Sequence, residues 1–325
     1  MVESRNELLR KQAEKQDRMV DLLQHCSKIS NGLDKLASNS GDRAIWELVQ
    51  NAKDLSEECH ICMTLSKDSF VFAHKGTPFN YETLTSLIKQ VSSSEKQFRK
   101  KNDNGQPKVG QYGTGFLTTH AFSRKIELKG CMEASLEGEP PCYVRLEDTE
   151  GHGFIIDREF TDIKEFVKKM NDQIEAAQEL LYKTVYPNPS EWTQLHYMLN
   201  DVALKKATVA LEQAKRLMPF VIAFNDKIKD VRIVSKLDED SFDITYQRES
   251  ESQEHIANYL VNHVRVEITG QKSRDVYCLC SDVQEQFDVH EKRDVAMEMH
   301  HDFACRRFLI EQCPELVIGI GKYPW

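Results

Sequence analysis

The feature that most constrains the fold is the segment 43–56, RAIWELVQNAKDLS, in which apolar and polar residues recur with the period of a helix. At about 100° per residue, Glu47, Asn51 and Asp54 fall together on one face. The apolar side chains occupy the opposite arc: Ile45, Leu48, Val49, Ala52 and Leu55. The segment therefore predicts a helix that buries one side and presents two carboxylates and a carboxamide on the other.

The polar face of this helix has two interpretations. Polar stripes on surface helices usually face solvent. This stripe, however, combines a small Asn with two acids and lacks the long Lys–Glu pairs that decorate exposed faces. A carboxylate and a carboxamide on one face can hold a hydrated magnesium ion and orient a water molecule. The face is therefore a candidate for chemistry.

A β-hairpin is predicted after the helix, because the alternating runs HICMTLS and SFVFAH lie on either side of a two-residue turn. The stretch His74-Lys75-Gly76-Thr77-Pro78 predicts a turn as the chain leaves the second strand, and a short helix over 81–91 follows. Residues 92–112 are polar. A connection of this length inside a compact domain is usually functional or disordered.

A glycine-rich turn ends that polar segment and enters a helix that we expect to begin near Thr114. Its sequence is Gly110-Gln111-Tyr112-Gly113-Thr114-Gly115-Phe116. Glycine lets backbone N–H groups approach an anion closely, and a helix N-terminus adds its positive dipole end. The spacing G-x-x-G-x-G differs from the Rossmann pattern, and no Walker motif is present. The turn predicts phosphate binding, with a plain turn as the alternative.

The rest of the chain predicts a mixture of helices and strands with a boundary near residue 218. Helices are expected at 158–183, 201–217 and 303–312. Strands are expected at 124–129, 143–147, 153–156, 192–199, 220–224, 230–235, 242–247, 260–268 and 275–280. The acidic segment 237–254 predicts a solvated hairpin or loop. We therefore expect a domain over 1–218 and a second α/β region over 219–325.

The N-terminal segment predicts one helix whose second half packs against the core. Residues 1–20 are strongly polar. A stripe with steps of three and four follows: Leu22, Cys26, Ile29, Leu33 and Leu36. An ordinary capping helix and a dimerisation strap both agree with this pattern.

Charge and composition narrow the classes of partner. The sequence has 43 basic and 52 acidic residues, a net charge of −9, which argues against nucleic acid bound along the whole surface; a local basic patch leaves local binding open. No apolar run approaches the roughly 18–20 residues that cross a bilayer. The N-terminus has no apolar signal-peptide centre. Nine cysteines without a framework fit reduced thiols, so we expect a soluble, cytoplasmic protein.

These motifs together resemble one family. A helix with the pattern E-x-x-x-N-x-x-D, a strand with a glycine turn, a lid-length polar segment and GQYGTGF follow in the order found in the GHKL ATPase superfamily. GQYGTGF is most similar to the ninety-kilodalton heat-shock chaperones, and ELVQNAKD with HKGTPF is similar to sacsin-type proteins. The resemblance covers 42–122, and more weakly extends to 199. It implies a Bergerat fold: an α+β, two-layer sandwich with a mixed, mostly antiparallel sheet and helices on one face, then a smaller coupling region.

The resemblance also implies the role of each motif residue. Glu47 is expected to activate water as general base, Asn51 to coordinate magnesium, and Asp54 to line the nucleotide pocket. Gly76 and Thr193 are expected beside the adenine. The nucleotide contacts expected from the glycine turn are Gly110, Gln111, Tyr112, Gly113, Thr114, Gly115 and Phe116. From the basic cluster 96–101, Lys96 is expected to reach the γ-phosphate; a solvated loop is the alternative.

One residue departs from the superfamily pattern. Most members have an aspartate that accepts a hydrogen bond from the adenine amino group, and this chain has His74 at that position. A neutral imidazole can still accept one hydrogen bond on its unprotonated nitrogen. The base preference of the site is therefore left open by the sequence.

The leading expectation is slow, magnesium-dependent ATP hydrolysis in which lid closure drives dimerisation, through the N-terminal helix and the lid, or remodels an unidentified protein partner. The main alternative is a nucleotide-gated interaction module, chaperone-like or part of a defence system, with little hydrolysis. Phosphotransfer to His25 and a zinc site at Cys59-His60-Ile61-Cys62 are weaker alternatives. Because sacsin-type relatives are commonly longer, the chain is expected to be a fragment or a reduced member.

Overall fold

The computed structural model describes residues 5–36, 40–90, 115–136, 138–238, 240–256 and 259–280. The described residues divide into two compact units. The first comprises residues up to Lys215 together with Arg232–Asp243, and the second comprises Arg216–Val231 together with the described residues from Ile244 onward. The domain limits expected from the sequence, 1–218 and 219–325, stay a prediction.

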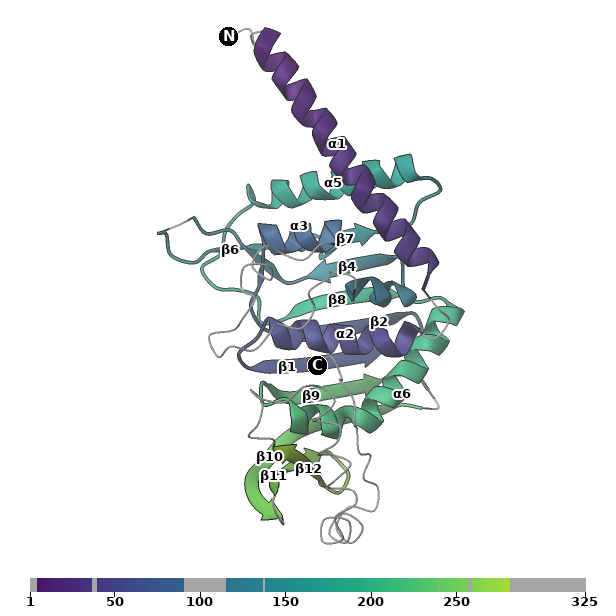
Figure 1. The fold of residues 1–325 in the computed structure, drawn as a ribbon, viewed down its shortest axis with the longest axis vertical. Coiled ribbons are helices and arrows are strands. Elements are labelled where there is room, and N and C mark those ends of the chain that lie inside the picture. Colours follow the sequence, from purple (N-terminus) through teal and green to yellow (C-terminus); the bar gives the residue numbers. More distant parts are fainter. Residues whose placement is uncertain are drawn as a thin grey trace. The chain divides into compact units, whose positions relative to one another are not determined.

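The first unit combines helices with a large sheet (Figure 1). Its helical elements are α1 (Arg5–Asp34), α2 (Ser40–Asp54), α3 (Tyr81–Lys89), the 3-10 helix η1 (Phe116–Ala121), α5 (Ile163–Leu180) and the larger part of α6 (Asp201–Phe224). Its main sheet contains β1 (Cys59–Leu65), β2 (Ser69–Lys75), β4 (Lys125–Lys129), β7 (Phe154–Asp157), β8 (Thr193–Met198) and, from Arg232 onward, β9 (Ile228–Ser235). The spatial order is β9-β1-β2-β8-β4-β7. From β1 to β7, neighbouring strands pair antiparallel.

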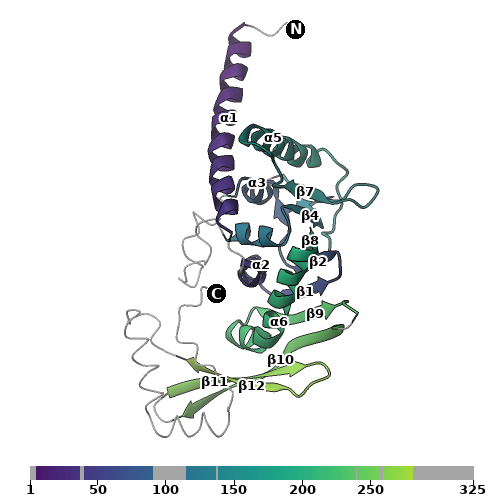
Figure 2. The ribbon, with the colours of Figure 1, turned by 90° about the vertical axis from the view of Figure 1, so that its right-hand side faces the viewer.

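The helices lie on one face of this sheet, which gives an α+β arrangement of two layers (Figure 2). Alternation of burial along the strands explains the layering, since every second side chain points to the helices. In β1 the buried residues are Cys59, Ile61, Met63 and Leu65. The antiparallel register places Ile61 opposite His74 and Met63 opposite Phe72. The hairpin predicted from HICMTLS and SFVFAH is thereby confirmed.

A small sheet accompanies the main one. Its strands β3 (Phe79–Asn80), β5 (Cys131–Glu133) and β6 (Tyr143–Arg145) have the order β3-β5-β6. β3 and β5 are parallel and β5 and β6 antiparallel. Asn80 then begins α3, where its side chain and that of Thr83 form a reciprocal capping box.

Helix α1 confirms most of the expected stripe, since Leu22, Cys26, Ile29 and Leu33 are buried, whereas Leu36 lies beyond the end of the helix and is only partly buried. They pack on the layer of helices, where the Cys26 Sγ lies 3.7 Å from the Met170 Sδ of α5. The first three turns are exposed, as the polar sequence predicts. In the part of the chain that the structure describes, no helix has both the length and the apolar character needed to span a bilayer.

The second unit contains the antiparallel strands β10 (Phe242–Ile256), β11 (Tyr259–Ile268) and β12 (Arg274–Cys280), in that spatial order, and the last turns of α6. One prediction is wrong here. The strand expected at 220–224 is the end of α6, which continues through Pro219 and buries Met218, Val221 and Ile222 at helical spacing. The acidic segment 237–254, expected to be a solvated hairpin or loop, contains most of β10, which includes the strand expected at 242–247 and is longer.

Candidate functional site

Helix α2 supplies the centre of the candidate site. Its buried side is apolar: Ala44, Ile45, Leu48, Val49 and Ala52. Glu47, Asn51 and Asp54 are only partly buried and follow one another along the other side, one turn apart. Leu55 lies just beyond the helix and is also partly exposed, because the chain leaves the helical path at Asp54. The core face predicted for this helix is therefore correct except at its last residue.

The carboxylate of Glu47 lies against the end of the glycine turn. A Cβ atom added to Gly115 would come within 2.6 Å of the Glu47 Cδ and 3.0 Å of its Oε1, and closer still to Oε2. Such approaches are far inside van der Waals contact. The glutamate thus fills the space that any side chain at residue 115 would need. Helix α2 and the glycine turn, distant in sequence, meet at this point.

Arg43, which sequence analysis missed, also contacts this carboxylate. Its Nε lies 3.2 Å from the Glu47 Oε1, one helical turn away. The Arg43 side chain is 69% exposed, whereas that of Glu47 is 17% exposed. The i,i+4 spacing of Arg43 and Glu47 was the available signal in the sequence.

A second group of residues joins the end of α2 to the end of β2. The Ser56 hydroxyl donates to the Ala52 carbonyl at 2.7 Å and contacts the Lys75 carbonyl at 3.1 Å. The Thr77 N–H donates to the Leu55 carbonyl at 2.9 Å. A Cβ on Gly76 would collide with the Ser56 Oγ. Gly76 is therefore needed because the helix end and the strand end approach each other so closely.

His74 is buried beside this junction, with 4% of its surface exposed. Its Nδ1 has no hydrogen-bond partner among the described residues. The position of a Cβ added to Gly76 lies 3.3 Å from this nitrogen, so the nitrogen faces the Gly76 turn. Burial lowers the pKa of the imidazole to about 4, outweighing the backbone contact of Lys75. The ring is neutral near pH 7 and retains unused hydrogen-bonding capacity.

Thr193 lies next to His74 in the sheet, because the register of β2 and β8 pairs the two residues. Its side chain is buried. The preceding residues fix this end of β8: Lys75 forms an ion pair with Glu191, and its Nζ lies 5.1 Å from the centre of the Trp192 ring. The structure therefore brings His74, Gly76 and Thr193 together at one end of the site.

The remaining predicted residues are placed as follows. Phe116 is a core residue whose ring meets that of His120 edge-on, with the ring centres 5.9 Å apart. The helix that follows is only the short 3-10 helix η1. The lid segment 92–112 and six predicted contacts lie outside the described residues: Lys96, Gly110, Gln111, Tyr112, Gly113 and Thr114.

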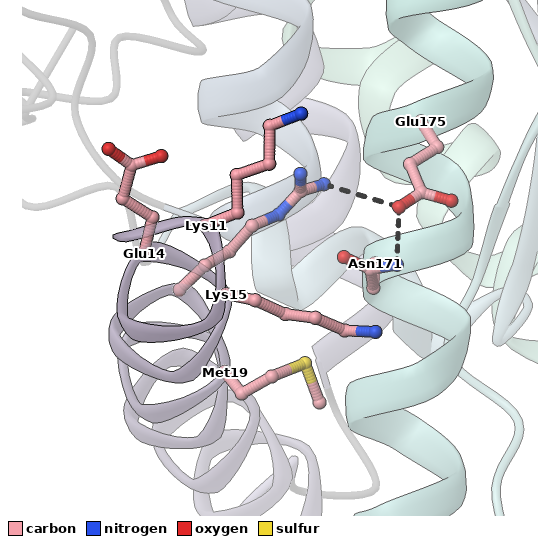
Figure 3. Close-up of a pocket in the computed structure, with 7 residues that line it drawn as sticks. Lys11, Glu14, Lys15, Met19, Asn171 and Glu175 are labelled. Carbon is pink, nitrogen blue, oxygen red and sulfur yellow. Dashed lines mark hydrogen bonds and ion pairs between the residues drawn. The ribbon is translucent and has the colours of Figure 1, made fainter. Parts of the chain in front are cut away.

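A hollow of about 570 Å³ opens elsewhere, between α1 and α5 (Figure 3). Its lining is mostly charged: Lys11, Glu14, Lys15, Arg18 and Glu175, together with the uncharged Met19 and Asn171. The Glu175 carboxylate accepts a hydrogen bond from Asn171 at 2.9 Å and lies 3.9 Å from the Arg18 guanidinium. Long surface side chains with such ion pairs are typical of solvated helix faces. None of the residues predicted for the nucleotide lines this hollow.

The zinc alternative has no support in the geometry. Cys59 and Cys62 are three residues apart on β1, so their side chains point to opposite faces of the sheet. Among the residues that the structure describes, no group of three or more His, Cys, Asp or Glu side chains is arranged so that it could hold a metal ion. A zinc site needs about four such ligands.

Comparison with known proteins adds no assignment. No protein-family model matches the chain, and no curated protein matches its sequence. Two groups of residues are therefore the candidates for function: Glu47 with Gly115, midway along α2, and His74 with Gly76, beside the C-terminal end of α2.

Proposed function

We propose that the first unit binds ATP with magnesium and hydrolyses it slowly, as a GHKL-type ATPase with a Bergerat fold. The observation that supports this most is the contact between the Glu47 carboxylate and Gly115. It brings a general base to the end of a glycine-rich turn, the kind of backbone that binds phosphate. The antiparallel sheet with helices on one face agrees with the proposed fold.

At the phosphate end, Glu47 would act as the general base. It would accept a proton from water while the water oxygen bonds to the γ-phosphorus. The bond from that phosphorus to the bridging oxygen would break, giving ADP and inorganic phosphate. Asn51, one turn further along α2, would hold a magnesium ion, which in such sites neutralises phosphate charge and takes its other ligands from phosphate oxygens and water. Asp54 would line the pocket beyond it.

At the base end, His74 provides the recognition. Its buried, unpartnered Nδ1 is costly unless a ligand completes it, because a polar atom loses its contacts with water on burial. A purine placed at the Gly76 turn would supply that contact. Thr193 lies beside His74 and would complete this wall of the pocket. The phosphates would then extend along the polar face of α2 towards Gly115.

The experiment that tests this proposal compares the wild-type protein with Glu47→Ala. Nucleotide binding is measured by thermal shift with ATP, ADP and a non-hydrolysable analogue, each with magnesium, and phosphate release is measured separately. A ligand that binds only the folded state raises the free energy of unfolding by about 2.7 kcal/mol when its concentration is 100 times its dissociation constant. We expect both proteins to be stabilised and only the wild type to release phosphate. Equal phosphate release by the two proteins would contradict the general-base role.

An interaction module with little hydrolysis is the second candidate, and one observation favours it. Three large apolar side chains of α1, Leu9, Val20 and Leu23, are about half exposed. Exposed apolar residues of this kind suit contact with a partner or a second copy. Closure of the lid and dimerisation, which involve residues 92–112, stay predictions. Nucleotide binding without phosphate release, together with dimerisation on adding ATP, would favour this candidate.

A further inference from the structure

We propose that Gly115 and Arg43 are positioning residues that hold the Glu47 carboxylate in one orientation. These three residues are called the Glu47 clamp below. The inference rests on the proposed function, because an oriented carboxylate matters most if Glu47 activates water. Its geometric part can be tested without any nucleotide.

Gly115 is needed for space and not for backbone freedom. Its φ of −61° and ψ of −48° are ordinary right-handed values that any residue adopts. Glycine usually occurs where the backbone has a positive φ or where an anion approaches the backbone closely. Here a Cβ would lie 2.6 Å from the Glu47 Cδ. The missing side chain leaves room for the carboxylate itself, so Gly115 forms one wall against which Glu47 rests.

Arg43 forms the second contact, at the other carboxylate oxygen. Its Nε is 3.2 Å from Oε1, whereas Gly115 adjoins Oε2 most closely. An exposed i,i+4 pair contributes little to stability, and a basic residue placed N-terminal to its acid is the less favourable order in a helix. The ion pair between Arg43 and Glu47 therefore adds little to the stability of α2. We infer that its main effect is to orient the Glu47 carboxylate.

The two contacts together restrict a side chain that otherwise has several rotamers. The backbone of Glu47 is already fixed, because its neighbours on α2 are buried in the core. Fixing the side chain as well removes conformations in which the carboxylate turns away from the glycine turn. A displacement of about 1 Å in a reacting group can cost on the order of 10²-fold in rate. The clamp would thus influence turnover far more than nucleotide affinity.

The geometric part is tested by a double-mutant cycle on thermal stability without nucleotide. Gly115→Ala should lower the Tm only slightly, because the new methyl group meets the flexible end of the Glu47 side chain, which can turn aside. The same substitution in a Glu47→Ala background should cost much less, since the space is then empty. Glu47→Gln is the matched control: its amide is as large as the carboxylate, so the full cost should return. Equal costs in all three backgrounds would overturn the clamp.

The kinetic part is tested with Arg43. We expect Arg43→Ala to lower kcat by about 10-fold while the Kd for a non-hydrolysable analogue stays unchanged, and Arg43→Lys to recover most of the loss, because lysine also supplies a cation. Gly115→Ala should lower kcat by about 10²-fold. Arg10→Ala is the control, because it breaks an i,i+4 ion pair of the same order, Arg10 with Glu14, on the exposed part of α1, and it should match the wild type. An unchanged kcat in Arg43→Ala, or no recovery with lysine, would overturn the role of Arg43.

The two experiments separate failure of the clamp from failure of the proposed function. If wild-type protein binds no nucleotide or releases no phosphate, the ATPase proposal fails, and the stability cycle still decides whether Gly115 and Glu47 are coupled. If phosphate release depends on Glu47 but the cycle shows no coupling, the clamp alone is wrong.

Discussion

The two ends of the candidate site differ in how far the protein itself completes them. At one end, the Glu47 side chain is partly exposed and contacts Arg43 and Gly115. At the other, His74 is buried, neutral and left with an unpartnered nitrogen. A group that must react benefits from being oriented in advance, whereas a group that recognises a ligand must keep a hydrogen bond to offer. The contrast agrees with the proposed roles, with hydrolysis at the first end and recognition of the base at the second.

The largest effect is expected from a substitution at Glu47, at the end of the site where hydrolysis is proposed. Glu47→Ala should reduce phosphate release by about 10²–10⁴-fold, the usual contribution of a general base, while the Kd for a non-hydrolysable ATP analogue stays within a few-fold of the wild type. Isothermal titration and a phosphate-release assay on the same preparation check this. If the variant lost binding and turnover together, the division between the two ends would be wrong.

The second largest effect is expected in the pH dependence of stability, which the buried histidines cause. Burial lowers the pKa of His74 to about 4 and that of His120 to about 3, so both stay neutral in the folded protein while the unfolded chain protonates below about pH 6.5. The unfolded state then binds more protons, and stability falls as pH falls. The free energy of unfolding should drop by about 1.4 kcal/mol per pH unit per histidine between pH 6.5 and 4.

Urea denaturation at a series of pH values measures that slope. His74→Gln should remove the contribution of His74 to the slope of unfolding free energy against pH and leave the contribution of His120 unchanged. A slope that is the same in His74→Gln as in the wild type would show that His74 is not held neutral by burial.

A smaller effect is expected for nucleotide binding by the recognition end. His74→Ala should weaken binding by about 10-fold, which corresponds to one hydrogen bond, with kcat little changed. A neutral imidazole can accept a hydrogen bond from the adenine amino group or donate one to a guanine carbonyl, so ATP and GTP should bind similarly. His74→Asp can only accept when ionised and should shift the preference towards ATP. A wild-type protein that rejects GTP would contradict this account.

The smallest expected effect concerns the junction between the two ends. Ser56→Ala removes a buried hydroxyl that bonds both to α2 and to the Lys75 carbonyl, and should cost about 1 kcal/mol in unfolding free energy. Thr85→Val is the control, because the Thr85 hydroxyl bonds only to carbonyls of its own helix. Equal losses in the two variants would mean that the contact between Ser56 and β2 does not matter.

Much of the first unit could be predicted from sequence because its signals are local. The apolar face of α2, the alternation in the β1–β2 hairpin and the stripe on α1 each depend on one periodic pattern, and the structure confirms them except at Leu55 and Leu36, which lie just beyond their helices. The run 218–224 was misjudged because a continuous apolar stretch fits a buried strand as well as a buried helix, and Pro219 favoured the break. The helix continues through Pro219 with one backbone hydrogen bond fewer, because proline has no N–H to donate.

The site itself was only partly predictable. The sequence places Glu47, His74 and Gly115 on a helix, a strand and a turn, but not the contacts between these elements. Arg43 and Ser56 were missed because their roles depend on contacts that only the tertiary fold creates. Arg43 contacts the carboxylate that lies against Gly115, and Ser56 contacts the end of the strand at Lys75. At residue 115 the structure adds a reason for glycine that the sequence did not show, because a Cβ there would meet the Glu47 carboxylate.

The most direct test of the central claim is a crystal structure with magnesium and a non-hydrolysable ATP analogue. The account predicts the γ-phosphate beside Glu47 and Gly115, the magnesium ion on Asn51, and the base within hydrogen-bond distance of the His74 Nδ1. A nucleotide bound with its base at Gly115, or in the charged hollow between α1 and α5, would contradict it.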